Sequence, residues 1–140
     1  MEQGLRDVCG VAVQGEGYRL SYRIAADNLR LDIHVVADSC NPIELTRLEW
    51  QQVAEVTSST FVNIEVICSD AEEHKKRVET RSANASDQSF PTWEEVLSRE
   101  YDHLWSADRI VIDTAGQSVE QSITALLTAI AVRVHALESA

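Results

Sequence analysis

The spacing of apolar side chains along this chain changes several times between the period of a helix and that of a strand. Leu20, Ile24 and Leu29 fall on one side of a helix, and a longer amphipathic stretch begins after Ser118. Helices are therefore expected over residues 17–31, 41–57, 70–81, 91–105 and 118–137.

Three short apolar runs, at residues 33–37, 61–68 and 110–112, lie between these helices and indicate strands. The first suits burial on both faces of a sheet, whereas the second carries Asn63 and Glu65 on one face. Strands separated by helices of this length pair in parallel through right-handed crossovers. The pattern predicts an α/β fold, a parallel sheet with flanking helices, formed by one domain over residues 1–140.

Polar residues mark where the helices should begin. Asn41 and Asp70 can cap the helices that follow them, and capping boxes start at Thr92 and Ser118. The stretch from about residue 82 to residue 90 has no periodicity, so it predicts a mobile, lid-type loop.

Charge narrows the choice of partners. The chain has 140 residues, of which 44% are hydrophobic and 25% charged, as is usual for a globular domain. Acidic residues outnumber basic ones by 23 to 12, which gives a net charge of −11. Such a field repels phosphate backbones and anionic lipids, so neither nucleic acid nor a membrane is expected as a partner.

Cysteine content and hydropathy bear on location. The three cysteines are odd in number and form no Cys-x-x-Cys pair, so neither a disulfide framework nor a zinc ribbon is indicated. The first residues are polar and lack the apolar core of a signal peptide. No apolar run approaches the roughly 20 residues that span a bilayer. We therefore expect a cytoplasmic location.

Ligands of parallel sheets bind beyond the carboxyl ends of the strands, so the polar residues after each strand are candidates for a site. They are Asp38, Ser39 and Asn41, then Ser69 and Asp70, and then Asp113, Thr114 and Gly116. Such residues also end strands and cap helices for structural reasons alone, and this alternative stays open for them. Asp38 directly follows the most buried run, where its carboxylate could hold a metal-bound water.

Arg77 and Arg81 are four residues apart and share one helix face, beside the basic stretch 74–76. This cluster could clamp phosphate through charge-assisted hydrogen bonds. The alternative is a solvated face whose basic side chains pair with the acidic ones nearby, which are Glu72, Glu73 and Glu79. The histidines lack metal-ligand spacing, and no motif of a catalytic triad is found.

A series of short segments follows in a fixed order along nearly the whole chain. They are Ala26-Asp27-Asn28-Leu29-Arg30, Val35-Val36-Ala37-Asp38-Ser39-Cys40-Asn41-Pro42, Thr46-Arg47, Trp50, Cys68-Ser69-Asp70, His74, Arg77-Val78-Glu79-Thr80-Arg81, Pro91-Thr92-Trp93, Arg99-Glu100-Tyr101 and Val111-Ile112-Asp113-Thr114-Ala115-Gly116. In this combination the chain resembles bacterial predicted kinases of the P-loop superfamily. Those proteins are often labelled AAA-family ATPases and are similar to small-molecule and zeta-toxin-like kinases.

The resemblance implies a five-stranded parallel sheet with helices on both faces, and ATP and Mg²⁺ as cofactors. It places Asp38 at the end of the strand that organises Mg²⁺, as a catalytic and metal-binding residue. It also places Arg77 and Arg81 in a lid that closes on the phosphates.

Two further groups of residues acquire roles from the same resemblance. The loop that holds Asp113, Thr114 and Gly116 would border the base of the nucleotide. Asn41 and Arg47 would lie where the acceptor substrate binds.

The chain departs from the family in the phosphate-binding loop. Family members carry Gly-x-x-x-x-Gly-Lys-[Ser/Thr] after their first strand, and its backbone N–H groups and lysine hold the phosphates. Gly10 and Gly15 have the matching spacing here, but Glu16 follows them in place of the lysine. The chain starts at a point that corresponds to just after the family's second strand. We therefore expect a truncated P-loop kinase-like three-layer sandwich without its first strand.

A missing first strand would affect assembly. In the family this strand is central, between those that correspond here to residues 33–37 and 61–67. Buried backbone groups left without hydrogen bonds cost roughly 1–3 kcal/mol each. The remaining strands must therefore pair directly, or another chain must fill the gap. A homodimer or a strand-donating partner is expected.

Three functions are compatible with these features. The first is a truncated kinase-like domain without phosphotransferase activity of its own, which acts as a binding or assembly module. The second is an ATP-dependent small-molecule kinase whose phosphate-binding loop is supplied upstream or by a partner. The third is a module that binds a small molecule other than a nucleotide. The sequence leaves open whether the chain is an enzyme.

Overall fold

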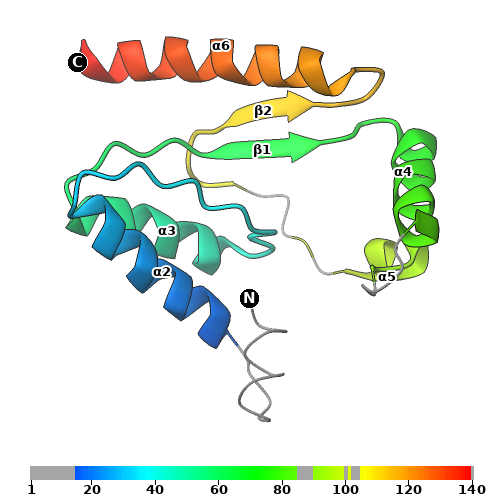
Figure 1. Ribbon diagram of the computed structural model, residues 1–140, viewed down its shortest axis with the longest axis horizontal. Coiled ribbons are helices and arrows are strands. Elements are labelled where there is room, and N and C mark those ends of the chain that lie inside the picture. The colour runs from blue at the N-terminus through cyan, green and yellow to red at the C-terminus, as the bar shows by residue number, and fades with distance from the viewer. Residues whose placement is uncertain (1–14, 85–89, 100, 102–104, 140) are drawn as a thin grey trace. The chain divides into compact units, whose positions relative to one another are not determined.

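The computed structural model describes residues 15–84, 90–99, 101 and 105–139. These residues form five helices and one sheet of two parallel strands (Figure 1), so the predicted α/β class is confirmed. The chain groups into two compact units. The first comprises Met1–Phe61 with Tyr101–Ser106, and the second comprises Val62–Glu100 with Ala107–Ala140.

Two helices that pack against each other form the centre of the first unit: α2 (Glu16–Leu29) and α3 (Glu44–Val56). Gly15 precedes α2 with a φ of 75°, a left-handed conformation that glycine adopts without steric cost. The buried side chains of the two helices include three alanines, which are Ala25, Ala26 and Ala54. The position of α2 confirms the helix predicted over residues 17–31.

The strand predicted over residues 33–37 is wrong. This segment has no regular secondary structure, and Val36 within it is 93% exposed. A strand persists only when a neighbour completes its hydrogen-bond ladder. The only sheet in the described part of the chain is made by two other segments, so residues 33–37 have no such neighbour there.

The helix cap predicted at Asn41 is also wrong. Ile43 occupies the cap position of α3 and provides no side-chain hydrogen bond. Asn41 has a φ of 43°, in the left-handed region that asparagine tolerates better than most residues. Its Oδ1 accepts a hydrogen bond from Trp50 Nε1 at 3.1 Å and another from Ser39 Oγ at 2.9 Å. Asn41 therefore shapes the loop before α3 rather than capping the helix.

The guanidinium of Arg47 joins this loop to a segment from much later in the chain. Arg47 is only 4% exposed, and its Nε donates to the carbonyl oxygen of Asn41 at 3.1 Å. Its Nη2 donates to the carbonyl oxygen of Pro42 at 3.4 Å. The ring centroids of Trp105 and Tyr101 lie 4.4 Å and 5.3 Å from the guanidinium carbon. Hydrogen bonds in the guanidinium plane and aromatic rings near the group together satisfy a buried charge.

Strands β1 (Ile64–Ile67) and β2 (Ile110–Asp113) form the sheet of the second unit. They pair in parallel, with Ile64 opposite Ile110, which confirms the predicted parallel pairing. Helix α6 (Val119–Glu138) packs along β2 (Figure 1), and Ile112 on that strand is buried.

Helices α4 (Ala71–Asn84) and α5 (Trp93–Ser98) connect the two strands. Asp70 caps α4 as predicted, because its Oδ1 accepts from the N–H groups of Glu72 and Glu73 at 2.9 and 3.0 Å. The capping boxes predicted at the starts of α5 and α6 are confirmed. Helix α4 continues three residues past its predicted end, and α5 ends well before residue 105. Residues 85–89 of the expected loop lie outside the described part.

No helix within the described residues is both long and apolar enough to cross a bilayer.

Replacement of Arg47 by alanine should destabilise the chain by about 2–4 kcal/mol, because buried hydrogen bonds and two aromatic contacts are lost together. Arg47→Lys keeps the charge but not the planar donors, so it should recover only part of the loss. Urea unfolding followed by tryptophan fluorescence measures both. Arg30→Ala, which removes an exposed ion pair with Asp27, serves as the matched control and should change stability by under about 1 kcal/mol. Equal effects of Arg47→Ala and Arg30→Ala would contradict this role.

Candidate functional site

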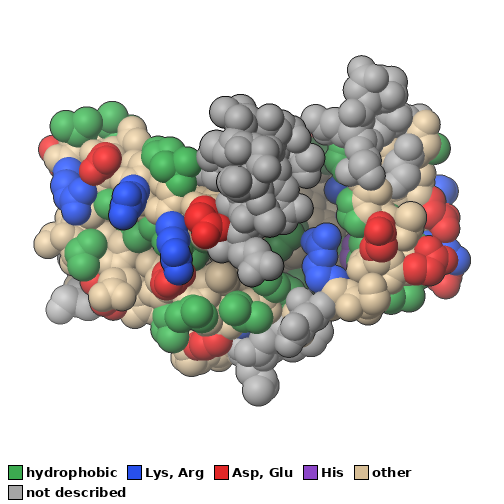
Figure 2. Space-filling view, turned by 90° about the horizontal axis from the view of Figure 1, so that it is seen from below, with side chains coloured by type: hydrophobic (Ala, Val, Ile, Leu, Met, Phe, Trp, Pro, Cys, Tyr) green, Lys and Arg blue, Asp and Glu red, His purple; other side chains and the backbone are tan. Residues whose placement is uncertain are grey.

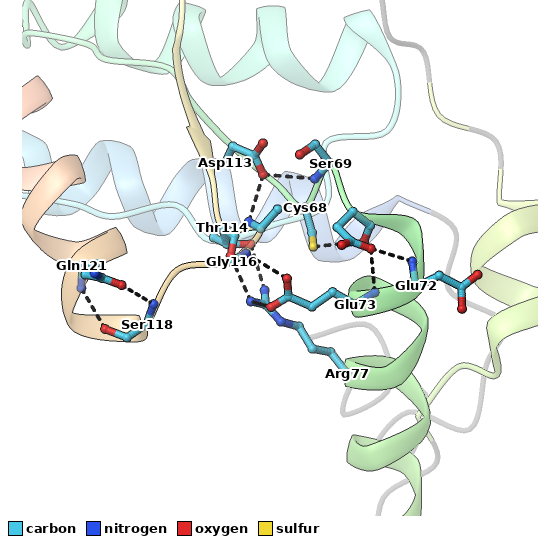
Figure 3. Close-up of polar contacts among 12 residues, drawn as sticks. Cys68, Ser69, Glu72, Glu73, Arg77, Asp113, Thr114, Gly116, Ser118 and Gln121 are labelled. Atoms are coloured by element: carbon cyan, nitrogen blue, oxygen red, sulfur yellow. Dashed lines mark hydrogen bonds and ion pairs between the residues drawn. The ribbon is translucent and has the colours of Figure 1, made fainter.

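Polar residues from the segment after β1, the end of β2 with the turn after it, and the first turns of α4 meet at the carboxyl end of the sheet (Figure 3). We call this set the sheet-end network, and it consists of Ser69, Glu73, Arg77, Asp113, Thr114 and Gly116. Five of these residues were candidate site residues from the sequence, namely Ser69, Arg77, Asp113, Thr114 and Gly116. Their meeting agrees with the rule that polar groups gather beyond the ends of parallel strands.

Arg77 is the centre of the network. Its Nη1 donates to Thr114 Oγ1 and its Nη2 to the carbonyl oxygen of Thr114, both at 2.9 Å. The same Nη2 lies 2.5 Å from Glu73 Oε1. Glu73 Oε2 in turn accepts from the backbone N–H of Gly116 at 2.8 Å. Arg77 and Glu73 together fasten α4 to the turn that follows β2.

Asp113 organises the other side of the same turn. Its Oδ1 accepts from the backbone N–H groups of Ser69 and Ala115, each at 3.0 Å. Hydrogen bonds lower the pKa of the Asp113 carboxyl below its usual value, with the larger effect from Ser69 and a smaller one from Ala115. Thr114 adds a bond from its N–H to the carbonyl oxygen of Ile67 at 2.9 Å. The turn is thus fixed to the end of β1 from two directions.

The donors of this network already have acceptors within the chain. A phosphate-binding loop presents free backbone N–H groups and cationic side chains to its ligand. Here the N–H groups of Ser69, Ala115 and Gly116 and the guanidinium of Arg77 are bonded to carboxylates and to Thr114. The donors named here are therefore engaged by groups of the chain itself.

Glu73 is a member of this network that was not predicted as a site residue. It lies four positions before Arg77, the order of an acidic and a basic side chain that favours pairing on a helix. That spacing predicts the ion pair within α4. Its second contact, to Gly116, depends on the tertiary fold and has no local signal.

The other predicted site residues are not members of the sheet-end network. Arg81 lies over the ring of Phe90, at 5.9 Å from its centroid. Asp38, Asn41 and Arg47 belong to the first unit. Asn41 and Arg47, expected near the acceptor substrate, bond to each other through the backbone of Asn41.

Asp38 borders a cavity of about 610 Å³ in the first unit. One face of α2 from Gly17 to Asn28, the segment Val35–Ser39 and the side chain of Trp50 line this cavity. Asp38 is the only charged residue among them. A volume of this size is within the usual range for small-molecule sites.

A magnesium site at Asp38 would need further oxygen ligands. No group of three or more His, Cys, Asp or Glu side chains that could hold a metal occurs in the described ranges. Among the residues that the structure describes, Asp38 is therefore not part of a ligand group of that size. We derive no catalytic step through Mg²⁺ or ATP.

Surface charge is mixed on the face drawn in Figure 2, where basic and acidic side chains are interspersed with hydrophobic ones. Comparisons of the chain with protein-family models, with curated proteins and with solved structures found no match. The likeness to P-loop kinases thus stays a prediction from the sequence segments.

The low pKa of Asp113 predicts a specific sensitivity to acid. A carboxyl whose pKa falls on folding contributes stability above its unfolded pKa of about 3.9, and the contribution is lost as pH falls through the folded value. Asp113→Asn keeps an acceptor oxygen but does not titrate. The variant should therefore lose less stability than the wild type between about pH 5 and pH 2.

Urea unfolding across that pH range measures the difference. Asp27→Asn is the matched control, because Asp27 is exposed and bonds Arg30 on its own helix at 2.9 Å. This control should keep the acid sensitivity of the wild type. Parallel pH curves for the wild type and Asp113→Asn would refute the assignment.

Proposed function

We propose that this chain is a domain of the P-loop kinase type that transfers no phosphate on its own and works as a binding or assembly module. Its 140 residues contain no Gly-x-x-x-x-Gly-Lys-[Ser/Thr] loop. The ordered sequence segments and the parallel strands with polar residues after them support the kinase-type frame. The proposal does not extend to an acceptor substrate.

One observation supports the proposal that the chain transfers no phosphate on its own. The groups that a nucleotide phosphate would require at the end of the sheet are bonded to Asp113, Glu73 and Thr114. A nucleotide that bound there would first have to break charge-assisted hydrogen bonds, which are about twice as strong as neutral ones. The missing loop lysine removes the cation that would offset this cost.

Thermal unfolding with and without millimolar Mg-ATP tests the proposal directly. A ligand at 100 times its Kd adds roughly 2.7 kcal/mol of stability. For a chain of this size such a gain raises Tm by about 5–10 °C. We expect no rise in Tm for the wild type, because the phosphate-binding donors are engaged.

If Mg-ATP does raise the Tm of the wild type, the same measurement on Arg77→Ala shows whether the nucleotide binds at the sheet-end network. A rise of several degrees in the wild type that disappears in Arg77→Ala would place nucleotide at the sheet-end network. That result would reject the proposal in favour of a kinase that obtains its phosphate-binding loop elsewhere.

The assembly part of the proposal rests on β1. Within the described residues β1 pairs only with β2, and Val66 on β1 is 63% exposed. Parallel sheets with so few strands and open faces are marginal in water, and a free strand edge favours pairing with another chain. We therefore propose a homodimer, or a partner that donates a strand, at the free edge of β1.

The backbone of Val66 provides the test. The carbonyl oxygens of Asn63 and Ile67 accept hydrogen bonds from the N–H groups of Ile110 and Thr114. Because the backbone groups of successive residues in a strand point to opposite edges, the N–H and C=O of Val66 point to the edge away from β2. Val66→Pro removes an N–H on that free edge without touching the bonds to β2. Light scattering at about 10 μM should give a dimer mass for the wild type and for Val66→Thr, but a monomer mass for Val66→Pro. A monomeric wild type would reject the homodimer.

A further inference from the structure

The carboxylate of Glu73 is held by donors from two separate segments of the second unit. Its two carboxylate oxygens meet two different donors, Oε1 with Arg77 Nη2 at 2.5 Å and Oε2 with the N–H of Gly116 at 2.8 Å (Figure 3). A guanidinium and a backbone N–H that each hold one oxygen of the same group form an ordinary binding arrangement for carboxylates and phosphates. In this chain the carboxylate in that arrangement belongs to Glu73 on α4.

The two donors are held in place by contacts that do not involve Glu73. Arg77 keeps two bonds to Thr114, one to the hydroxyl and one to the carbonyl oxygen, each at 2.9 Å. The turn that carries Gly116 is held by Asp113, which accepts from Ala115 at 3.0 Å, and by the bond between Thr114 and Ile67. Removal of the Glu73 carboxylate therefore leaves the donors close to their present positions.

We propose that Arg77 and the Gly116 N–H form a binding position for the carboxylate or phosphate group of a small molecule, and that Glu73 is its resident, displaceable occupant. The Glu73 side chain is 31% exposed, so it can turn outward into solvent when another anion takes its place. The ligand class is a small oxyanion with two oxygens on one centre. This inference stands on the described contacts and does not depend on the proposed function.

Because Glu73 is tethered close to its donors, free anions should compete poorly with it. A tethered group reaches an effective concentration in the millimolar range or above. A free anion of similar intrinsic affinity must exceed that concentration to displace Glu73. The network should therefore be closed to weakly binding anions in the wild type and open to them when the carboxylate is absent.

Glu73→Ala tests the inference with two probes, inorganic phosphate and acetate, each compared with sodium chloride at the same ionic strength. At ten times its Kd an anion should raise the Tm of this variant by about 4–7 °C. The wild type should shift by less than about 1 °C at the same concentrations. The relative effects of acetate and phosphate distinguish a preference for carboxylate from one for phosphate.

Two control variants separate the site from general charge effects. Glu79→Ala removes the same charge from the same helix, where Glu79 lies 4.0 Å from Lys75, and should show no anion-specific shift. The double variant Glu73→Ala with Arg77→Ala should lose the shift seen in Glu73→Ala alone. In the responsive variant, the backbone amide signal of Gly116 should move with anion concentration in nitrogen–proton NMR spectra.

Three outcomes would overturn the inference. They are an unchanged Tm of Glu73→Ala in phosphate and acetate, an equal shift in chloride, and a shift that persists without Arg77. If Glu73→Ala does not fold in chloride, refolding in phosphate or acetate becomes the measurement. Recovery of the folded state in either anion supports the site, and failure in both rejects it. Each of these results is independent of whether the wild type binds Mg-ATP.

Discussion

A guanidinium group has five N–H donors in one plane, and each unit of this chain uses one such group to hold a loop against a helix. In the first unit, Arg47 on α3 donates to the backbone carbonyls of the loop before that helix. In the second unit, Arg77 on α4 donates to the backbone and the hydroxyl of Thr114. Both arginines donate to main-chain carbonyl oxygens, and Arg77 also donates to the Thr114 side chain. The loop before α3 and the turn after β2 are thus each tied to a helix by one arginine.

Most features that depend on neighbouring residues could be predicted from the sequence, although the helix cap expected at Asn41 could not. The cap at Asp70, the capping boxes at Thr92 and Ser118 and the course of α2 all follow from residues within one or two turns. Features that need a distant partner were predicted only in part: the parallel pairing of β1 with β2 was predicted, but the lack of a pairing for residues 33–37 within the described part was not. Residues 33–37 have the composition of a buried strand, but composition does not supply the second strand that a ladder needs.

The candidate site likewise has some features that could be predicted from the sequence and others that could not. The sequence places Arg77, Asp113 and Thr114 at strand ends or on a basic helix face, and the structure brings them together. The sequence could not indicate that the Glu73 side chain would contact the N–H of Gly116, because that contact joins residues far apart in the chain. The basic cluster was open to two interpretations, a phosphate clamp or a face of ion pairs. Arg77 pairs with Glu73 in the way the second describes, and it also holds the turn after β2.

The aromatic rings that cover Arg47 have a consequence for how the chain can be made and divided. Tyr101 and Trp105 follow β1 and α4 in the chain and are therefore synthesised after them. The first unit is thus completed only after residues 62–100 of the second unit have been synthesised. Neither unit is a continuous stretch of polypeptide. A fragment that stops at Phe61 would expose the guanidinium that the full chain covers, and expression of the first unit alone would require residues 101–106 to be joined back by a linker.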